Sequence, residues 1–338
     1  MSRIPTRLPV LALAVLIPFA AACGGSDEPR TTSEGGTTPV VSASSNTGTE
    51  ASSTGPAVVT PISYEAAESA FGAGRYPEAT ELFTAYTVSK PENPWGYYML
   101  GLSAWKAGEH EKASGAFDKA LELDPDHRKS LFNSSRVLLE TGQAAEALER
   151  IEKALSLEPL SNEGLRLLGR ARYELGNVDE AIKAYQRALT IDERDVWSMN
   201  NLGHIYIQQD RSCEALPPLA RAVELRSNAP VFQNNLGTGL ERAGYPAAAA
   251  RAYEAAIAVD STYAKASGGL ARVTSGGQEI ESTPIDLVRL SEKFQADIEV
   301  WRGPAEVGTG MPADSAVDSA VVSGGKLSDT LEQCSPEI

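Results

Sequence analysis

The segment "WSMNNLGHIY" (Trp197–Tyr206) shares the tetrapeptide NNLG with "FQNNLGTGL" (Phe232–Leu240), and the two copies lie 34 residues apart. Asparagine is a poor residue for the middle of a helix, so its return at a fixed interval requires a structural reason. A period of this length is typical of an array of helical hairpins, in which each repeat buries one face against the next. The register of the array therefore has to be established before the asparagines can be interpreted.

Rows of 34 residues, counted from Thr60, bring like residues into the same columns. Small residues or a Leu-Gly pair fill one column, at Ala66-Ala67, Leu100-Gly101, Ser134-Ser135, Leu168-Gly169, Leu202-Gly203 and Leu236-Gly237. Alanine fills another, at Ala79, Ala113, Ala147, Ala181, Ala215 and Ala249. A larger apolar residue follows each alanine by four positions, at Phe83, Phe117, Ile151, Tyr185, Leu219 and Tyr253. Such columns predict six hairpins, with small residues where two helices approach closely.

Each row also has a residue suited to the turn between its two helices. These are Gly74, Gly108, Gly142, Gly176, Asp210 and Gly244. The whole pattern resembles tetratricopeptide repeats over residues 60–263. The resemblance implies an all-α, right-handed superhelical solenoid of six helix-turn-helix repeats with a C-terminal capping helix.

The sequence after the repeats predicts three further segments. Residues 264–277 are expected to form the capping helix, because an end repeat would otherwise leave an apolar face uncovered. Residues 278–303 carry Leu287, Leu290, Phe294, Ile298 and Trp301 at helical spacing, after a start signal at Thr283-Pro284, and predict an amphipathic helix. We expect this helix to extend the cap; the alternative is that it folds back into the groove of the repeats. Residues 304–338 have the composition of a disordered tail.

The N-terminal residues predict export and a lipid anchor. Residues 1–22 have the basic start and short apolar stretch of a signal peptide, interrupted by Pro9 and Pro18. The sequence "FAAAC" resembles the lipobox of bacterial lipoproteins, which implies that Cys23 is acylated and becomes the mature N-terminus; Ala20 departs from the usual Leu. The alternative is an ordinary signal peptide that leaves Cys23 free. Residues 23–59, rich in Gly, Ser and Thr, predict a disordered linker.

Composition argues against several classes of function. The formal net charge is −15, from 30 basic and 45 acidic residues, and the basic residues are dispersed, so nucleic acid is not an expected partner. Three Cys and three His without ligand spacing offer little for a metal site, and no motif for a cofactor is present. None of the three histidines has a catalytic partner at a recognisable spacing, so we expect no enzyme.

In tetratricopeptide arrays, the first helix of each hairpin lines a concave groove that holds a peptide or a helix of a partner protein. Carried over row by row, the resemblance implies a set of peptide-binding residues here. They are Lys129, Asn133, Arg136, Arg166, Arg170, Asn200, Asn201, His204, Asn234 and Asn235, with Tyr173 beside them. Because this set contains no acid, it predicts a surface that accepts an acidic or C-terminal carboxylate group.

The asparagines of the opening segment occupy equivalent columns at Asn133, Asn201 and Asn235. An amide can donate to and accept from a peptide backbone, so they predict an incomplete ladder along the groove. The alternative is that they face water or bond to the neighbouring hairpin. The first two rows instead offer an aromatic and apolar end, and the two ends together suit an amphipathic partner. The residues of this end are Tyr64, Phe71, Trp95, Tyr98, Met99, Leu102 and Trp105, some of which pack between hairpins in an alternative reading.

Two local features remain. Pro217 and Pro218 fall within the second helix of the fifth hairpin and predict a lost hydrogen bond and a kink. We expect a tolerated distortion of the outer face; the alternative is that the kink changes the direction of the last repeats. Cys213 and Cys334 can form a disulfide in an oxidising compartment or remain as two free thiols, and the spacing leaves both open.

Together these features predict a membrane-anchored scaffold that binds a protein or peptide partner in its groove. The expected location is the bacterial cell envelope, on the outer membrane facing the periplasm if there are two membranes. One alternative is a self-associating structural component of the envelope, in which the groove of one copy holds the C-terminal amphipathic helix of another. Another is an assembly factor for a secretion or pilus system, because pilotins share this layout of lipid anchor and helical repeats.

Overall fold

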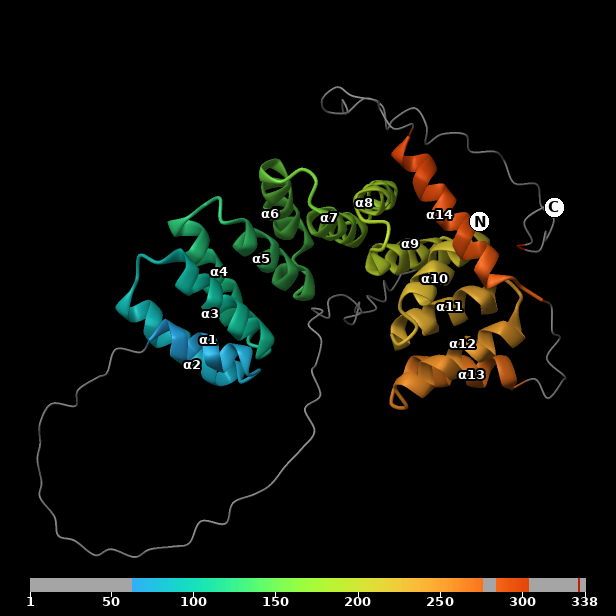
Figure 1. The fold of residues 1–338 in the computed structure, drawn as a ribbon, viewed down its shortest axis with the longest axis horizontal. Helices are drawn as coiled ribbons and strands as arrows, with labels where there is room; N and C mark the ends of the chain where they lie inside the picture. The colour runs from blue at the N-terminus through green and yellow to red at the C-terminus, as the bar shows by residue number, and fades with distance from the viewer. Residues whose placement is uncertain (1–62, 276–283, 304–333, 335–338) are drawn as a thin grey trace, which may run out of the picture. The chain divides into compact units, whose positions relative to one another are not determined.

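The computed structural model describes residues 63–275, 284–303 and 334, and within them the chain forms fourteen α-helices. Twelve of these form six consecutive hairpins (Figure 1). The pairs are α1 (Tyr64–Gly72) and α2 (Tyr76–Ser89), α3 (Pro94–Lys106) and α4 (His110–Leu123), α5 (Arg128–Glu140) and α6 (Ala144–Leu157), α7 (Asn162–Glu174) and α8 (Val178–Ile191), α9 (Val196–Gln208) and α10 (Ser212–Leu225), and α11 (Pro230–Arg242) and α12 (Pro246–Val259). The prediction of six hairpins in one register is confirmed.

The turns between paired helices have the backbone conformation that the glycine column predicts. Gly74, Gly108, Gly142, Gly176 and Gly244 all have positive φ, between 73° and 85°. Asp210 takes the same place in the fifth hairpin with φ of 58°, and is the one non-glycine residue with positive φ in the described part of the chain. Asp tolerates this region better than most residues, so the register continues through a substitution.

The small residues of the Leu-Gly column lie where the two helices of a hairpin touch. A Cβ atom on Gly203 would be 2.4 Å from Cγ of Leu219, and one on Gly237 would be 2.7 Å from the ring of Tyr253. Both distances are well below van der Waals contact, so only glycine allows this packing. The larger apolar residue of each hairpin thus fills the space that the missing side chain leaves.

The hairpins stack in chain order, and their two kinds of helix have different neighbours. Among the first helices, α3 packs on α5, α5 on α7 and α9 on α11, and each also packs on the second helix of its own hairpin. The second helices lie between successive first helices, since α2 packs on both α1 and α3, and α6 on both α5 and α7. We call the surface formed by the first helices the first-helix surface.

The array ends with α13 (Ala264–Thr274), which packs on α12 and α11 as expected of a capping helix. Its last predicted residues, 276 and 277, lie outside the described residues. Buried Ala266 and Gly269 face the sixth hairpin, where Gly269 lies against the Tyr253 ring.

The amphipathic helix differs from its prediction in both extent and position. Helix α14 (Leu287–Arg302) begins after Asp286, whose side chain accepts a hydrogen bond from Arg289 N, so the start signal at Pro284 precedes the helix by three residues. It packs against α10 and α8 (Figure 1), which are second helices. Both predicted positions, an extension of the cap and the groove, are therefore wrong. Instead, apolar residues of α14 pack on apolar residues of the outer face of α10.

Helix α10 runs unbroken from Ser212 to Leu225 with Pro217 and Pro218 inside it, and both prolines are buried. The prolines lie on the outer face of an unbroken helix, and this face is covered by a further helix, which the sequence analysis did not anticipate. Cys213 and Cys334 are joined by a disulfide, with their Cα atoms 5.2 Å apart. Of the two possibilities for the cysteines, the structure has the bridge.

No helix among the described residues is both long enough and apolar enough to cross a membrane. The predicted signal peptide, the linker with Cys23 and most of the predicted tail, residues 304–333 and 335–338, lie outside the described residues.

Candidate partner-binding surface

The predicted peptide-binding residues all lie on first helices, from α5 to α11, as the register requires. Their exposure differs widely. Lys129 is exposed, Asn133 and His204 are half-buried, and Asn200 and Arg170 are buried. The structure thus places these residues on neighbouring helices, but part of the set lies within the packing between hairpins.

The arginines of this surface bind carboxylates of the array itself. Arg136 donates to Oε1 of Glu163 on the next first helix, at 2.6 Å from Nη2 and 3.2 Å from Nε. Arg166 donates to Oδ1 of Asp195, the N-cap residue of α9, at 3.2 Å. Each of these ion pairs joins one hairpin to the next.

Arg170 is more deeply held. Its Nε donates to Oε1 of Glu174 at 2.8 Å and its Nη2 to the backbone oxygen of Leu139 on α5 at 3.2 Å. Burial raises the pKa of the Glu174 carboxyl, and the neighbouring Arg170 acts in the opposite direction. The expectation of a surface without acids is therefore wrong, because Glu163, Glu174 and Asp195 lie among the predicted basic residues.

The asparagines bond within the array. Asn235 Nδ2 donates to Oδ1 of Asn200 at 2.8 Å, across the interface of the fifth and sixth hairpins. Asn201 Nδ2 donates to the hydroxyl of Tyr185, in the preceding hairpin, at 3.2 Å. Asn133 donates to the backbone of Lys129 in its own helix at 2.9 Å. Of the two interpretations of Asn201 and Asn235, bonding to the neighbouring hairpin is what the structure has.

Asn234 and His204 complete the set. Asn234 is buried, and its Nδ2 lies 3.3 Å from Oδ1 of Asn235. The imidazole of His204 packs edge-on against the ring of Tyr173, with centroids 6.3 Å apart. Burial lowers the pKa of His204, and the positive charges of Lys265 and Arg242 lower it further. Burial and the nearby cations of α11 and α13 therefore both disfavour protonation of this imidazole.

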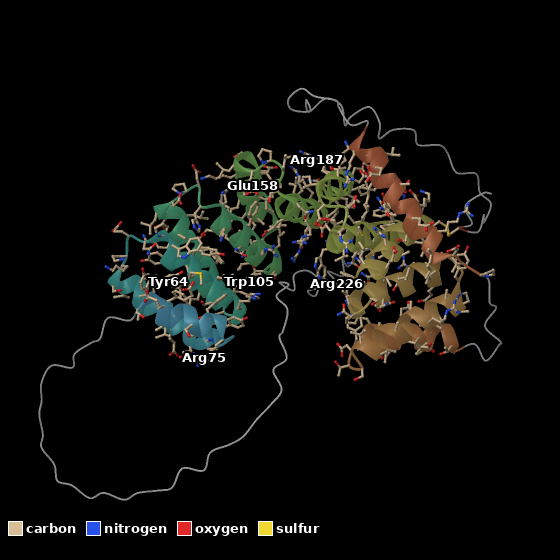
Figure 2. The ribbon with its side chains drawn as sticks, in the orientation of Figure 1. Tyr64, Arg75, Trp105, Glu158, Arg187 and Arg226 are labelled. Atoms are coloured by element: carbon tan, nitrogen blue, oxygen red, sulfur yellow. A yellow bond between two sulfur atoms is a disulfide. The ribbon has the colours of Figure 1, made fainter. Side chains whose placement is uncertain are left out.

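The aromatic end of the surface centres on Trp95 at the start of α3, and Figure 2 shows Tyr64 and Trp105 in the same part of the array. The Trp95 ring is 38% exposed, and its Nε1 donates to the hydroxyl of Tyr64 at 2.6 Å. The ammonium of Lys129 lies 5.0 Å from the Trp95 ring centre, a cation–π distance. Tyr98 and Met99 are buried and belong to the core, so fewer of the predicted residues are accessible to a partner at this end.

Acidic residues are what the sequence analysis missed on this surface. Glu163 stands one period after Lys129, in the same column, and Asp195 immediately precedes the fifth row. Their pairing with arginines 27 and 29 residues earlier was detectable by comparing each row with the next. A list built from basic and amide residues alone leaves out these partners.

The comparisons with known proteins concern the fold. The family profile described as "Tetratricopeptide repeat" matches residues 64–128 and 132–196. The fold is similar to a tetratricopeptide repeat protein from Parabacteroides merdae, with a TM-score of 0.55 at 15% identity over 64% of this chain and 86% of that one. It is also similar to the APC/C hetero-tetramer Cut9–Hcn1, with a TM-score of 0.56 at 19% identity over 62% of this chain and 41% of that one. No curated protein matches the sequence significantly.

Proposed function

The described helices form a tetratricopeptide-repeat array, and from this premise we propose that the chain is a scaffold that holds a protein or peptide partner on its first-helix surface. Arrays of this kind generally serve protein interaction rather than catalysis. The observation that carries the proposal is the exposed Trp95, with the Lys129 ammonium 5.0 Å from its ring centre and its Nε1 bonded to the Tyr64 hydroxyl. An exposed aromatic ring in a fixed position is the usual anchor of a protein interface.

The partner we propose is amphipathic, with an apolar side chain against Trp95 and an acidic group near Lys129. Lys129 is exposed, and the contact of its ammonium is with an aromatic ring, whereas Arg136, Arg166 and Arg170 already bind carboxylates. A carboxylate of the partner would have to displace an internal carboxylate at those arginines, and the free energy of the lost ion pair would offset much of that of the new one. We therefore assign the first contact to the Trp95 end, with the basic and amide residues as a second, weaker contact.

Capture of the native partner tests this proposal. The full chain, crosslinked and recovered from the native envelope, is compared with two variants. Trp95→Ala removes the anchor and should weaken capture by about tenfold, the loss typical of an interface anchor. Val88→Ala removes a side chain that is 80% exposed near the end of the second helix α2, and should leave capture unchanged. Equal capture by both variants would refute the assignment.

We further propose that acylated Cys23 anchors this scaffold in the bacterial cell envelope, with the partner recruited there. Several acyl chains hold a protein on a membrane almost irreversibly, whereas one chain does so only marginally. Cys23→Ser should move the full chain from the membrane fraction to the soluble fraction and abolish labelling by a fatty-acid probe. Partner capture by the purified variant should persist, because the anchor and the partner surface are separate. Failure of this test would therefore reject the lipid anchor without rejecting the Trp95 contact.

The second candidate is a self-associating component of the envelope, and a pilotin-like assembly factor is a special case of the scaffold. The amphipathic character of α14 was the reason to consider self-association. Its apolar residues Leu290, Phe294 and Ile298 are buried against the chain's own helices, which removes that reason. The scaffold is therefore the function we favour.

A further inference from the structure

Helix α10 differs from the other second helices on its outer face. The columns of Pro217 and Ala220 hold charged or polar residues in the neighbouring hairpins. These are Glu149 and Glu152 in the third, Lys183 and Gln186 in the fourth, and Arg251 and Glu254 in the sixth. Pro217 and Ala220 are buried, whereas Glu152 and Glu254 are exposed. The outer face of α10 is therefore an apolar surface that another element has to cover.

Helix α14 provides the cover. Leu290 belongs to the same apolar cluster as Leu216 and Ala220 of α10, and Phe294 and Ile298 belong to a cluster with Ala222. These positions follow one another by four residues, so a single stripe of α14 makes the contact. The opposite side of the helix is exposed, with Val300 at 75%.

Polar contacts fix the position of α14 along this surface. The Ser291 hydroxyl donates to Oε2 of Glu224 on α10. At the other end of α14, Arg302 donates to the backbone oxygen of Thr190 at 3.1 Å and pairs with Glu193 at 3.0 Å. Helix α14 therefore spans from the fifth hairpin to the end of the fourth.

The disulfide makes a second attachment to the same helix. Cys213 is the second residue of α10, and Cys334 lies 121 residues later in the sequence. Cys334 packs beside the apolar cluster that contains Leu290. Cys213 is exposed, so a thiolate in solution can reach the bond. The chain after α13 is thus held on α10 twice, once by apolar contacts and once covalently.

We propose that these two attachments form a redox-sensitive clasp: the Cys213–Cys334 disulfide keeps α14 closed on α8 and α10, and a dithiol reductant loosens it. One thiolate of the dithiol attacks a sulfur of the bridge and forms a mixed disulfide, releasing the other cysteine as a thiolate that takes up a proton. The second thiolate of the dithiol then displaces the remaining cysteine. Two cysteine thiols and one oxidised dithiol result, and two electrons pass to the protein.

Loss of the bridge loosens α14 because it removes one of two tethers. In the oxidised chain, α14 is connected to the array before its first residue through α13 and after its last residue through Cys334. In the reduced chain only the first connection remains, so an opened α14 returns less often. The buried stripe still favours the closed position, which makes opening a change in population rather than a complete release.

Hydrogen–deuterium exchange of the full chain tests the clasp. In the oxidised chain, peptides from residues 287–302 should exchange slowly. Dithiothreitol should accelerate their exchange by about tenfold, within the range of stabilisation by a disulfide, while peptides from α3 to α5 stay unchanged. In the double variant C213S/C334S, exchange should already be fast and indifferent to dithiothreitol. Peptide mapping without reductant should recover Cys213 linked to Cys334.

A matched pair of variants tests the helix contact in the oxidised chain. Phe294→Ala removes a buried ring and should accelerate exchange of α14, whereas Val300→Ala changes an exposed position of the same helix and should not. The clasp is overturned if dithiothreitol leaves the exchange of α14 unaltered, if mapping finds two free thiols, or if the two single variants behave alike.

Discussion

Asn200 illustrates at the scale of one residue how the polar side chains of the first helices serve stability. It is 2% exposed, and its Oδ1 accepts a hydrogen bond from Asn235 in the next hairpin. A polar group at this depth has to be bonded, because an unpaired one costs more than a bonded one gains. The repeated asparagine therefore has a role between hairpins, whatever partner the surface binds.

Asn200→Ala should lower the free energy of unfolding by about 1–2 kcal/mol, because Asn235 loses its buried acceptor. Asn133→Ala is the control, since that amide bonds only to its own helix backbone in the contacts described, and alanine is the better helix former. Urea denaturation of both variants measures the difference. Equal stability of the two variants would contradict the role between hairpins.

The imidazole of His204 predicts a pH dependence. Its pKa is lowered from 6.5 by burial and nearby cations, so the unfolded chain binds a proton more readily than the native one below that value. Stability that is present at neutral pH is thus lost as the pH falls through this window. His204→Gln should reduce the loss of unfolding free energy between about pH 8 and about pH 5. The pKa of His127 is also lowered by burial, and this residue contributes equally to the pH dependence of the wild-type chain and of the variant.

At the scale of the helix pair, the hairpin depends on the close approach of α9 and α10 at Gly203. Because Gly203 has no side chain, Leu219 of α10 packs directly against the backbone of α9. Gly115 shows the opposite case, a glycine within α4 with nothing within 4 Å of an added Cβ. Packing therefore requires a glycine at position 203 but not at position 115.

Gly203→Ala should destabilise the chain by about 1–3 kcal/mol, because the added carbon overpacks the contact with Leu219. Gly115→Ala should stabilise it by up to about 1 kcal/mol through helix propensity alone. Thermal unfolding followed by circular dichroism gives both values. A stabilising Gly203→Ala would mean that the helices separate more easily than the packing indicates.

At the scale of the whole molecule, α14 decides which surfaces remain available. Because it lies on the second helices α8 and α10, it covers part of the outer side of the array. A chain that ends at Ser275 should expose Leu216 and Ala220 and therefore self-associate.

Light scattering under reducing conditions tests this expectation. The chain ending at Ser275 should give larger species than the full chain, whereas a chain ending at Gly303, which keeps α14, should not. Loss of oligomers on truncation to Ser275 would instead favour the self-associating alternative.

The sequence alone determined the hairpins, their register, the turn positions and the capping helix. These features repeat every 34 residues and depend on contacts within one hairpin or with its neighbour, so each row supports the same reading. The outer face of α10 could also be predicted, because Pro217 and Ala220 stand in columns that hold charged or polar residues in the third, fourth and sixth hairpins, but only a comparison of rows reveals it. The carboxylate partners of the arginines were not anticipated, because residue type was read without its partner in the next row.

Only the tertiary structure decided where α14 packs and which cysteines pair. Each of these joins segments outside the period, such as Cys213 with Cys334 or Arg302 with Thr190. A repeat pattern specifies local neighbours, but it carries no information on a contact that occurs once. Such contacts depend on the three-dimensional distance between surfaces that only the folded array creates.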